Sequence, residues 1–453
     1  MIPRTVVSVE LDGADALTVK LAKASSEFDR MRVPLPLGCD PDAMPAWTTP
    51  RAVEAHGRTL LDKLRGHPAI KEALAELLRA PLTQKRPLYF HILADEGERL
   101  WWEALCDKDQ FLSLDARWPI ARMADSGVDK QVAVHVFNPP LKVLVLLSAL
   151  GRDATPEWQR FYEAVESARR DGLPVSVTAL IGQPSLFQSL TADIGAGTVT
   201  GVTVQPIPDR LPDLAAVINN LGPHIVHFFC HGTASSGTAR LELAVFADVA
   251  RNDGKSQVVL AVETLMGFQG MQDAWLVTLN CCEGGKSVER LHSMAYRLVA
   301  AGVPTAVGML EPVDAADAYE FCGYFYSAAF TAIREAFAEA RNNGAAEVRW
   351  ADALFPPRTA LGGSHPDPAD NRQWLRPVLY VRPEPFEIRA PAAQAPPAAD
   401  LAAMKQRAET VAGVLRAMPP NTPPEVRQSV LDLLADLPPG LRPDASGNFS
   451  TGG

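Results

Sequence analysis

The sequence predicts an α/β protein with a mainly parallel sheet that is covered by helices on both faces. Between residues 130 and 310, short runs rich in Val, Leu and Ile alternate with longer segments in which apolar residues recur at helical spacing. Continuous apolar runs are typical of parallel strands, because both faces of such strands are buried under helices. We therefore expect a layered α/β core of about six strands over residues 140–382.

The expected elements of this core follow one another in a regular order. The strands are expected at residues 132–137, 142–150, 174–182, 199–207, 224–230, 274–281, 304–310 and 375–382. The helices are expected at residues 155–172, 183–191, 211–221, 262–269, 286–301 and 315–341. Because the ends of parallel strands meet at one edge of a sheet, functional residues are expected beyond the carboxyl ends of these strands.

Composition divides the rest of the chain. After Arg382 the sequence becomes rich in Pro and Ala, which is typical of a semi-rigid linker, and two short helical patterns follow. The expected parts are an N-terminal α/β portion at 1–139, the core at 140–382, a linker at 383–398, a small helical module at 399–438 and a disordered tail at 439–453.

Charge and cysteine content exclude several classes of protein. The formal net charge of the 453-residue chain is -10, which argues against a protein that binds nucleic acid or an anionic membrane through bulk positive charge. No secretory leader or membrane-spanning run is apparent, so we expect a cytoplasmic protein. The 6 cysteines are then expected to be reduced and to serve packing or chemistry.

Two strand ends carry the residues best suited to chemistry. The segment HIVHFFCHGTASSG is a buried strand that ends at His231-Gly232, and AWLVTLNCCEGG repeats the arrangement about 50 residues later with Cys281 and Cys282. A nucleophilic cysteine needs a base within hydrogen-bond reach and donors for the oxyanion. We predict His231 as the base and Cys282 as the nucleophile.

The residues around Cys282 favour a reactive thiolate. Glycines at 284 and 285 allow a sharp turn, and the helix that follows would lower the pKa of the thiol through its N-terminus. The backbone N–H groups of Gly232 and Cys282 are the natural oxyanion-hole pair. Since no acidic partner for His231 is close to it in the sequence, we predict a dyad and not a triad.

These motifs resemble the CHAT domain family, which is related to caspases, separase and gingipains. HFFCHG matches the family's strand-His-Gly motif, and LNCCEGG matches its Leu-small-small-Cys-Glu-small-Gly motif. ERLWWEAL and AGVPTAVGMLEPVDAADA match two further motifs, although Trp102 replaces a usual Pro and Glu311 a usual Trp. The resemblance covers roughly residues 50–382 and implies a caspase-like three-layer sandwich.

The resemblance also implies a function. It implies a cysteine endopeptidase without a cofactor or catalytic metal, acting on a protein substrate. Relatives select a basic side chain with an acidic pocket residue, a role that Asp314, Asp317 or Glu311 could take here, although each could equally cap the helix that follows. The resemblance further implies a bacterial defence or cell-death system, with an activating or sensor protein partner tethered through the C-terminal module.

We expect the peptidase to be latent until it is activated. A misplaced loop such as residues 233–256 could hold it inactive until a partner reorders that loop. Self-cleavage is conceivable at Arg240 and Arg251 in this loop and near Arg389 in the linker.

Several alternatives remain open on the sequence alone. If the strand register differs by one residue, Cys281 becomes the nucleophile. Cys230, His231, Cys281 and Cys282 could in principle bind zinc, and GGKS at 284–287 resembles part of a phosphate-binding loop. A catalytically silent scaffold that recruits partners is the main alternative function, and acyl or thiol chemistry on a small molecule is a third.

Overall fold

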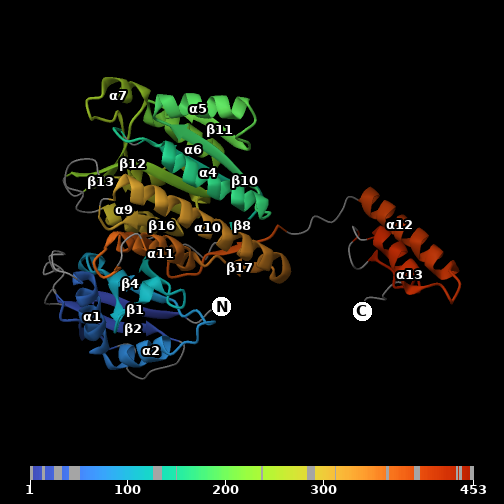
Figure 1. Cartoon of the computed structure of the whole chain (residues 1–453), viewed down its shortest axis with the longest axis horizontal. Helices are drawn as coiled ribbons and strands as arrows, with labels where there is room; N and C mark the ends of the chain where they lie inside the picture. Colours follow the sequence, from blue (N-terminus) through green and yellow to red (C-terminus); the bar gives the residue numbers. More distant parts are fainter. Residues whose placement is uncertain are drawn as a thin grey trace. The chain divides into compact units, whose positions relative to one another are not determined.

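The computed structural model describes most of the chain, which divides into two compact units, residues 1–390 and 391–453 (Figure 1). The residues described are 4–12, 16–24, 33–39, 51–125, 135–148, 150–235, 238–282, 291–311, 313–363, 367–391, 398–434, 437 and 441–448. Side chains are not described at 233–239, 281–282, 291–293 and 398–403.

One large sheet organises the first unit. In the described part of the chain 14 strands belong to it, in the order β11-β10-β9-β12-β15-β16-β18-β7-β4-β1-β2-β3, with β13 paired to β12 and β14 paired to β13. Their bounds are β1 Thr5–Leu11, β2 Leu17–Lys23, β3 Leu35–Pro36, β4 Leu88–Ile92, β7 Ile120–Ala124, β9 Leu141–Leu147, β10 Val175–Ile181, β11 Val202–Pro206, β12 Ile225–Ser235, β13 Thr238–Leu243, β14 Val258–Ala261, β15 Leu276–Cys282, β16 Thr305–Met309 and β18 Pro377–Val381.

The sheet consists of two parallel halves that run in opposite directions. Strands β11, β10, β9, β12, β15 and β16 are mutually parallel, and so are β18, β7, β4 and β1. The halves meet where β16 pairs antiparallel with β18. The carboxyl ends of β12 and β15 therefore lie at the opposite edge of the sheet from the carboxyl end of β4, which the ERLWWEAL segment follows.

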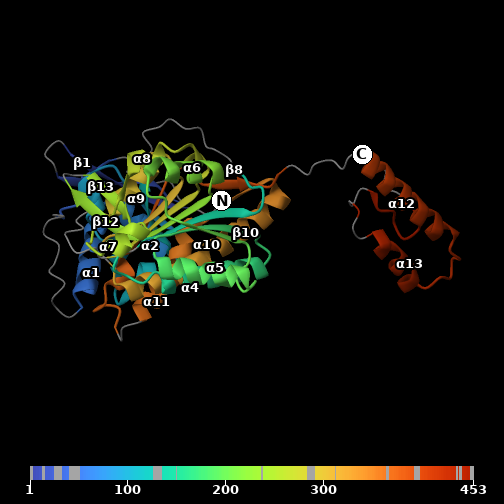
Figure 2. The same ribbon diagram turned by 90° about the horizontal axis from the view of Figure 1, so that it is seen from above.

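Helices cover both faces of the first half, as the apolar runs predict. The alternation within β9 is direct evidence, because Val143 and Val145 belong to one core cluster and Leu144 and Leu146 to the other. Figure 2 shows α4, α5, α10 and α11 on one side of the sheet and α6, α8 and α9 on the other. Their bounds are α4 Thr155–Arg170, α5 Pro184–Gly195, α6 Leu211–Leu221, α8 Val262–Met266, α9 Leu291–Ala300, α10 Ala315–Asn343 and α11 Phe355–Gly363.

The N-terminal half has its own apolar cluster beneath two helices, α1 Ala52–Arg65 and α2 Pro68–Leu78. Shorter elements complete the unit. They are the helices α3 Asp95–Glu98 and α7 Phe246–Arg251, the 3-10 helices Trp102–Ala104, Leu112–Leu114, Gln269–Asp273, Trp350–Leu354 and Gln373–Leu375, a β5–β6 pair (Cys106–Asp107 and Gln110–Phe111) and a sheet of β17 Ala345–Glu347, β19 Glu387–Arg389 and β8 His135–Val136.

A buried ionic cluster ties β7 to the segment that follows β4 and to α11. Arg122 on β7 forms a two-pronged ion pair with Glu103, at 3.0 and 2.7 Å, and neither side chain is exposed. Burial opposes the charge of Arg122, but the Glu103 carboxylate outweighs it and the pKa of Arg122 rises. Arg358 on α11 also faces Glu103, and burial lowers its pKa to about 10.

The predicted α/β class with a mainly parallel central sheet is confirmed, and two details differ. β12 was expected to end near Cys230 but continues to Ser235, because its last residues pair with β13 in a hairpin. The first residues of the predicted linker at 383–398 belong to the first unit, because β19 pairs with β17 and β8.

The second unit is a small helical module. It contains α12 Ala398–Ala417 and α13 Pro424–Leu431, followed by a 3-10 helix at Asp432–Leu434. Its apolar core consists of Ala408, Val411, Leu415, Leu434 and Leu437. Part of the tail that we expected to be disordered forms a turn in which the Asp444 carboxylate accepts hydrogen bonds from the backbone of Ser446 and Asn448.

Removing one partner of the buried ion pair should destabilise the first unit strongly. We expect Glu103→Ala to lower the free energy of unfolding by about 3–5 kcal/mol, because it leaves the charge of Arg122 buried and unpaired. Glu320→Ala, which breaks a pair with Arg160 at 42% and 48% side-chain exposure, should cost no more than about 1 kcal/mol. Denaturant unfolding measures both, and equal losses would contradict the prediction.

A half-buried histidine should make the fold sensitive to acid. His224 stacks on Trp275, and its Nδ1 accepts a hydrogen bond from the backbone of Lys142. Burial, Lys142 and His135 lower its pKa from 6.5 to about 4. The unfolded chain therefore binds the proton first, and stability should fall by roughly 2–3 kcal/mol as pH drops from 6.5 to 4. His224→Gln should reduce that loss in unfolding curves measured across this range.

Candidate functional site

The two predicted strand ends lie side by side. β12 and β15 pair in parallel from Ile225 opposite Leu276 to the last pair, in which His231 lies opposite Cys282. The structure thus brings together the two positions that the sequence predicts as base and nucleophile. The alternative nucleophile, Cys281, lies opposite Cys230. The structure describes the backbone of Cys281 and Cys282 but not their side chains.

A backbone carbonyl orients the half-buried imidazole of His231. Its Nε2 lies 2.5 Å from the carbonyl oxygen of Leu150. Since a carbonyl only accepts, Nε2 must carry the hydrogen, and in the neutral ring the lone pair is then on Nδ1. Nδ1 is buried and has no hydrogen-bond partner among the described residues. The orientation therefore leaves Nδ1 as the atom that can accept a proton.

The loop that supplies this carbonyl is held from several sides. Gly151, directly after Leu150, has a φ of 73°, a left-handed conformation that favours glycine. The Asp153 carboxylate accepts hydrogen bonds from the backbone of Thr155 at 2.9 Å and from Gln183 at 3.0 Å. The hydroxyl of Tyr319 donates to the Asp153 carbonyl at 2.6 Å. The loop is thus tied to the starts of α4, α5 and α10.

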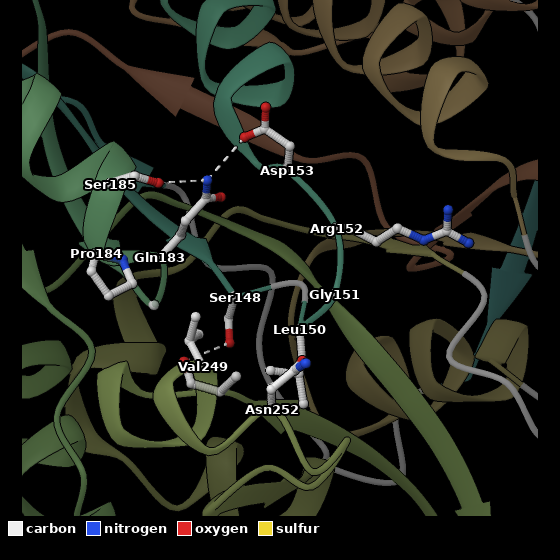
Figure 3. Close-up of a pocket in the computed structure, with 12 residues that line it drawn as sticks. Ser148, Leu150, Gly151, Arg152, Asp153, Gln183, Pro184, Ser185, Val249 and Asn252 are labelled. Atoms are coloured by element: carbon white, nitrogen blue, oxygen red, sulfur yellow. Dashed lines mark hydrogen bonds between the residues drawn. The ribbon is translucent and has the colours of Figure 1, made fainter.

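A cavity of about 460 Å³ opens beside this loop. Its wall is formed by the residues after β9, by the start of α5 and by α7 with the turn that follows it (Figure 3). Polar groups in the wall include Ser148, Gln183 and Asn252, whereas the side chain of Arg152 extends away from Gln183 and Ser185. Arg152 makes no ion pair with any residue in the described part of the chain. The cavity adjoins the proposed base through Leu150.

The acidic residues predicted for a basic-selective pocket are mostly engaged. Glu311 contacts Arg372 at 3.3 Å and Arg376 at 3.6 Å, and Asp317 contacts Arg376 at 3.8 Å. Burial raises the pKa of Asp317, an effect that Arg376 opposes. Asp314 occupies the N-cap position of α10, but its side chain makes no capping hydrogen bond. Their role in selecting a basic side chain stays a prediction.

Gly232 is buried and continues β12 opposite Leu241. The backbone N–H of Gly232 can serve an oxyanion hole only if the β12–β13 hairpin leaves it free to point to the substrate. The role stays a prediction. Glu283, Gly284 and Gly285, together with the GGKS segment at 284–287 and the start of the predicted helix at 286, lie outside the described residues.

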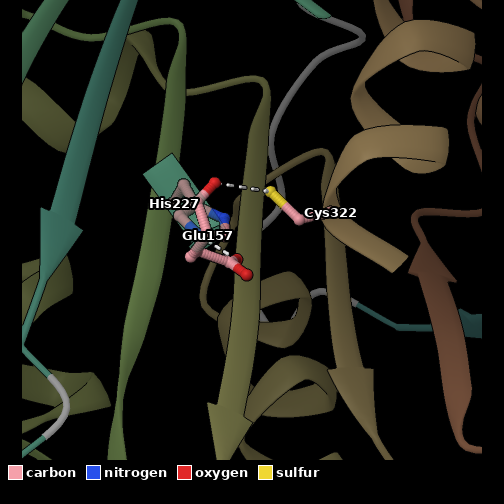
Figure 4. A group of neighbouring side chains, drawn as sticks. All are labelled: Glu157, His227 and Cys322. Carbon is pink, nitrogen blue, oxygen red and sulfur yellow. Dashed lines mark hydrogen bonds and ion pairs between the residues drawn. The ribbon is translucent and has the colours of Figure 1, made fainter. Parts of the chain in front are cut away.

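The residues considered as zinc ligands from the sequence do not converge in the part of the site whose side chains are described. Cys230 packs in one core cluster, while its neighbour Phe229 packs in the other, so strand alternation turns Cys230 and His231 to opposite faces. A different group, formed by Glu157, His227 and Cys322, does converge, with ligand atoms within 4.8 Å of one another (Figure 4). Burial holds the pKa of the Cys322 thiol well above its usual value, so it is a neutral thiol.

Sequence reasoning missed two contributions to this site. Leu150 acts through a backbone carbonyl, which no residue type signals. Glu157 is a charged residue in an amphipathic helix, where an exposed position would be the ordinary expectation, yet its side chain is fully buried.

The sheet and the register define an α/β protein with a histidine and a cysteine paired across neighbouring parallel strands. The chain belongs to the CHAT domain family, whose model matches residues 68–351. A comparison with curated proteins finds no match. In the described residues, no helix is long and apolar enough to cross a membrane.

Solved structures similar to the chain include a separase and a caspase. The Saccharomyces cerevisiae separase–securin complex matches with 14% identity and a TM-score of 0.32, covering 74% of this chain and 17% of that one. The chain thus spans less than a fifth of that protein. The Drosophila initiator caspase Dronc matches with 8% identity and a TM-score of 0.29, covering 59% of this chain and 92% of that one.

The loop that carries Leu150 should control reactivity at position 282. At Gly151 an alanine Cβ meets nothing within 4 Å, so Gly151→Ala adds only backbone strain, about 1–2 kcal/mol. We expect it to slow alkylation of Cys282 by about tenfold, because His231 loses its orientation. Gly172→Ala is the matched control, with a φ of 89° and equally open space. Alkylation slowed equally in both variants would contradict the assignment.

Proposed function

We propose that the protein is a cysteine endopeptidase with His231 as general base and Cys282 as nucleophile. The observation that carries the proposal is that these positions form the last parallel pair of β12 and β15, with the imidazole oriented by Leu150. Strand alternation assigns position 282 to the same face as Asn280, and position 231 to the same face as Phe229. Membership of the CHAT family supports this reaction class.

The chemistry follows from the tautomer. Nδ1 of His231 takes the proton of the Cys282 thiol, and the sulfur attacks the peptide carbonyl to form a C–S bond. Backbone N–H groups, with that of Gly232 as a candidate, stabilise the oxyanion. The imidazolium returns its proton to the leaving amine as the C–N bond breaks. A water molecule, deprotonated by His231, then hydrolyses the thioester and releases the carboxylate.

The proposal includes a protein substrate and control by a partner. The helical module of residues 391–453 is a separate compact unit with a core of its own, which suits attachment to a sensor or activating protein. A role in a bacterial defence or cell-death system and a cytoplasmic location complete the proposal. If the chain is instead a silent scaffold, its cellular effect should survive Cys282→Ala.

Covalent labelling tests the dyad directly. Peptide acyloxymethyl-ketone probes should give a single adduct by intact mass, and Cys282→Ala should abolish it. His231→Ala should slow labelling roughly 10³-fold, because the thiol loses its base. Probes bearing Arg and Asp before the reactive group should be compared, since Glu311 and Asp317 are paired with arginines.

Cys281→Ala is the matched control, and it should label like the wild type. An adduct that survives Cys282→Ala but is lost in Cys281→Ala would move the nucleophile by one residue. No adduct on the wild type, even after cell lysate has been added, would contradict an active peptidase and favour the scaffold.

A further inference from the structure

A buried carboxylate lies beneath the proposed dyad and contacts both strands that carry it. Glu157, in the first turn of α4, is fully buried. Its Oε1 accepts a hydrogen bond from Nδ2 of Asn280 on β15 at 2.7 Å and lies 3.0 Å from Nε2 of His227 on β12. The amide of Asn280 also donates to the carbonyl of Ala318 on α10 at 2.9 Å. The Glu157 carboxylate and the Asn280 amide together thus join two strands and two helices.

The register places this network directly below the dyad. His227 precedes His231 by four positions on β12, and Asn280 precedes Cys282 by two on β15. Because alternate residues of a strand share a face, these positions lie on the same face as the dyad, roughly 7–13 Å along the strands. Phe229, between His227 and His231, pairs with Asn280.

The network also reaches the loop that orients His231. α4 begins at Thr155, directly after the loop that contains Leu150 and Asp153. A carboxylate near a helix N-terminus is stabilised by the helix dipole, which favours Glu157 in the first turn of α4. Glu157 therefore ties all three components of the site to one another, namely the strand of His231, the strand of Cys282 and the loop of Leu150.

A carboxylate such as that of Glu157 is costly to bury, and its surroundings leave little room for movement. The His227 ring lies between Phe161, stacked at 6.1 Å, and Tyr326, edge-on at 5.4 Å. Removing one partner of a buried charged group typically costs several kcal/mol, so the geometry of such a network is strongly held. A group that is held this firmly can set distances between the elements it joins.

A metal site is the alternative explanation of this cluster. Cys322 is the third member of the converging group, and its Sγ donates to the backbone carbonyl of Glu157 at 4.0 Å. Oε1 of Glu157 accepts the hydrogen bond from Asn280, whereas Oε2 of Glu157 and both ring nitrogens of His227 have no hydrogen-bond partner among the described residues. The neutral thiol of Cys322 and the Asn280 hydrogen bond favour a polar network, and a measurement of zinc binding to the wild type separates the two explanations.

We infer that Glu157 is a positioning residue of the peptidase, which holds the strands of His231 and Cys282 and the Leu150 loop in register through His227 and Asn280. The inference rests on the proposed function. It predicts that loss of the carboxylate lowers the reactivity of Cys282, although the described contacts of Glu157 are with Asn280, His227 and Cys322 and not with the imidazole of His231.

Alkylation of Cys282 by iodoacetamide, followed by site-resolved mass spectrometry across pH, tests the inference in the full chain. Glu157→Gln keeps size and an acceptor but removes the charge, and Asn280→Ser removes the link to β15. We expect each to lower the alkylation rate and kcat by about tenfold or more with KM within about twofold. The double variant should be no worse than the more severe single one, because both break the same link.

Controls separate positioning from stability. Cys322→Ser, in the same cluster, should change alkylation and kcat by less than about twofold. A lower melting temperature in Glu157→Gln and Asn280→Ser with unchanged alkylation would show a merely structural role and overturn the inference. One equivalent of zinc in the wild type that is lost in Cys322→Ser would also overturn it.

The peptidase proposal can fail separately. Alkylation of Cys282 that depends on Glu157 and His231 supports the positioning role even if no peptide is cleaved. Peptide cleavage with full activity in Glu157→Gln would support the peptidase and reject the positioning role.

Discussion

The structure depends on one constraint, the parallel register of β12 and β15. In a parallel pair, residues in register stay opposite one another along the whole strand, so the register that buries Val226 beside Val277 also sets His231 opposite Cys282. A slip of one residue would turn every side chain to the other face and separate the pair. The apolar interior of the sheet thus determines the geometry of the site.

The face of this pair that meets α4 and α10 is unusual for a protein core. Beneath the site it carries His227, Thr278 and Asn280, all fully buried, where an apolar strand would serve packing better. Polar partners from the covering helices offset such a cost, and Glu157 and the Ala318 carbonyl supply them for the amide nitrogen of Asn280. The same interactions fix α4 and α10 on the sheet.

Much of this arrangement could be predicted from sequence because it depends on local pattern. Continuous apolar runs indicated the parallel strands, and His231 and Cys282 followed such runs. The antiparallel junction of β16 with β18 and the continuation of the sheet into β7 could not be predicted, since they depend on pairing between distant segments. The extension of β12 to Ser235 was not predicted, because its Gly, Thr and Ser residues are typical of a loop.

The site itself was predictable only where side chains carry the chemistry. A carbonyl such as that of Leu150 is present at every residue, and only the fold shows which one meets His231. The role of Glu157 could not be predicted either, because a glutamate in the first turn of a helix is common on a surface. Tertiary packing alone decides that this one is buried.

A carbonyl partner has a physical consequence for the proposed dyad. A carboxylate would stabilise a charged imidazolium strongly at short range, whereas a neutral carbonyl contributes only a dipole. The orientation of the His231 ring therefore depends more on where the Leu150 loop lies than on charge attraction. That loop is held by Tyr319 at the start of α10 and by Gln183 at the start of α5, and through α4 by Glu157. A shift of the start of α10 would therefore move the proposed base without any direct contact to it.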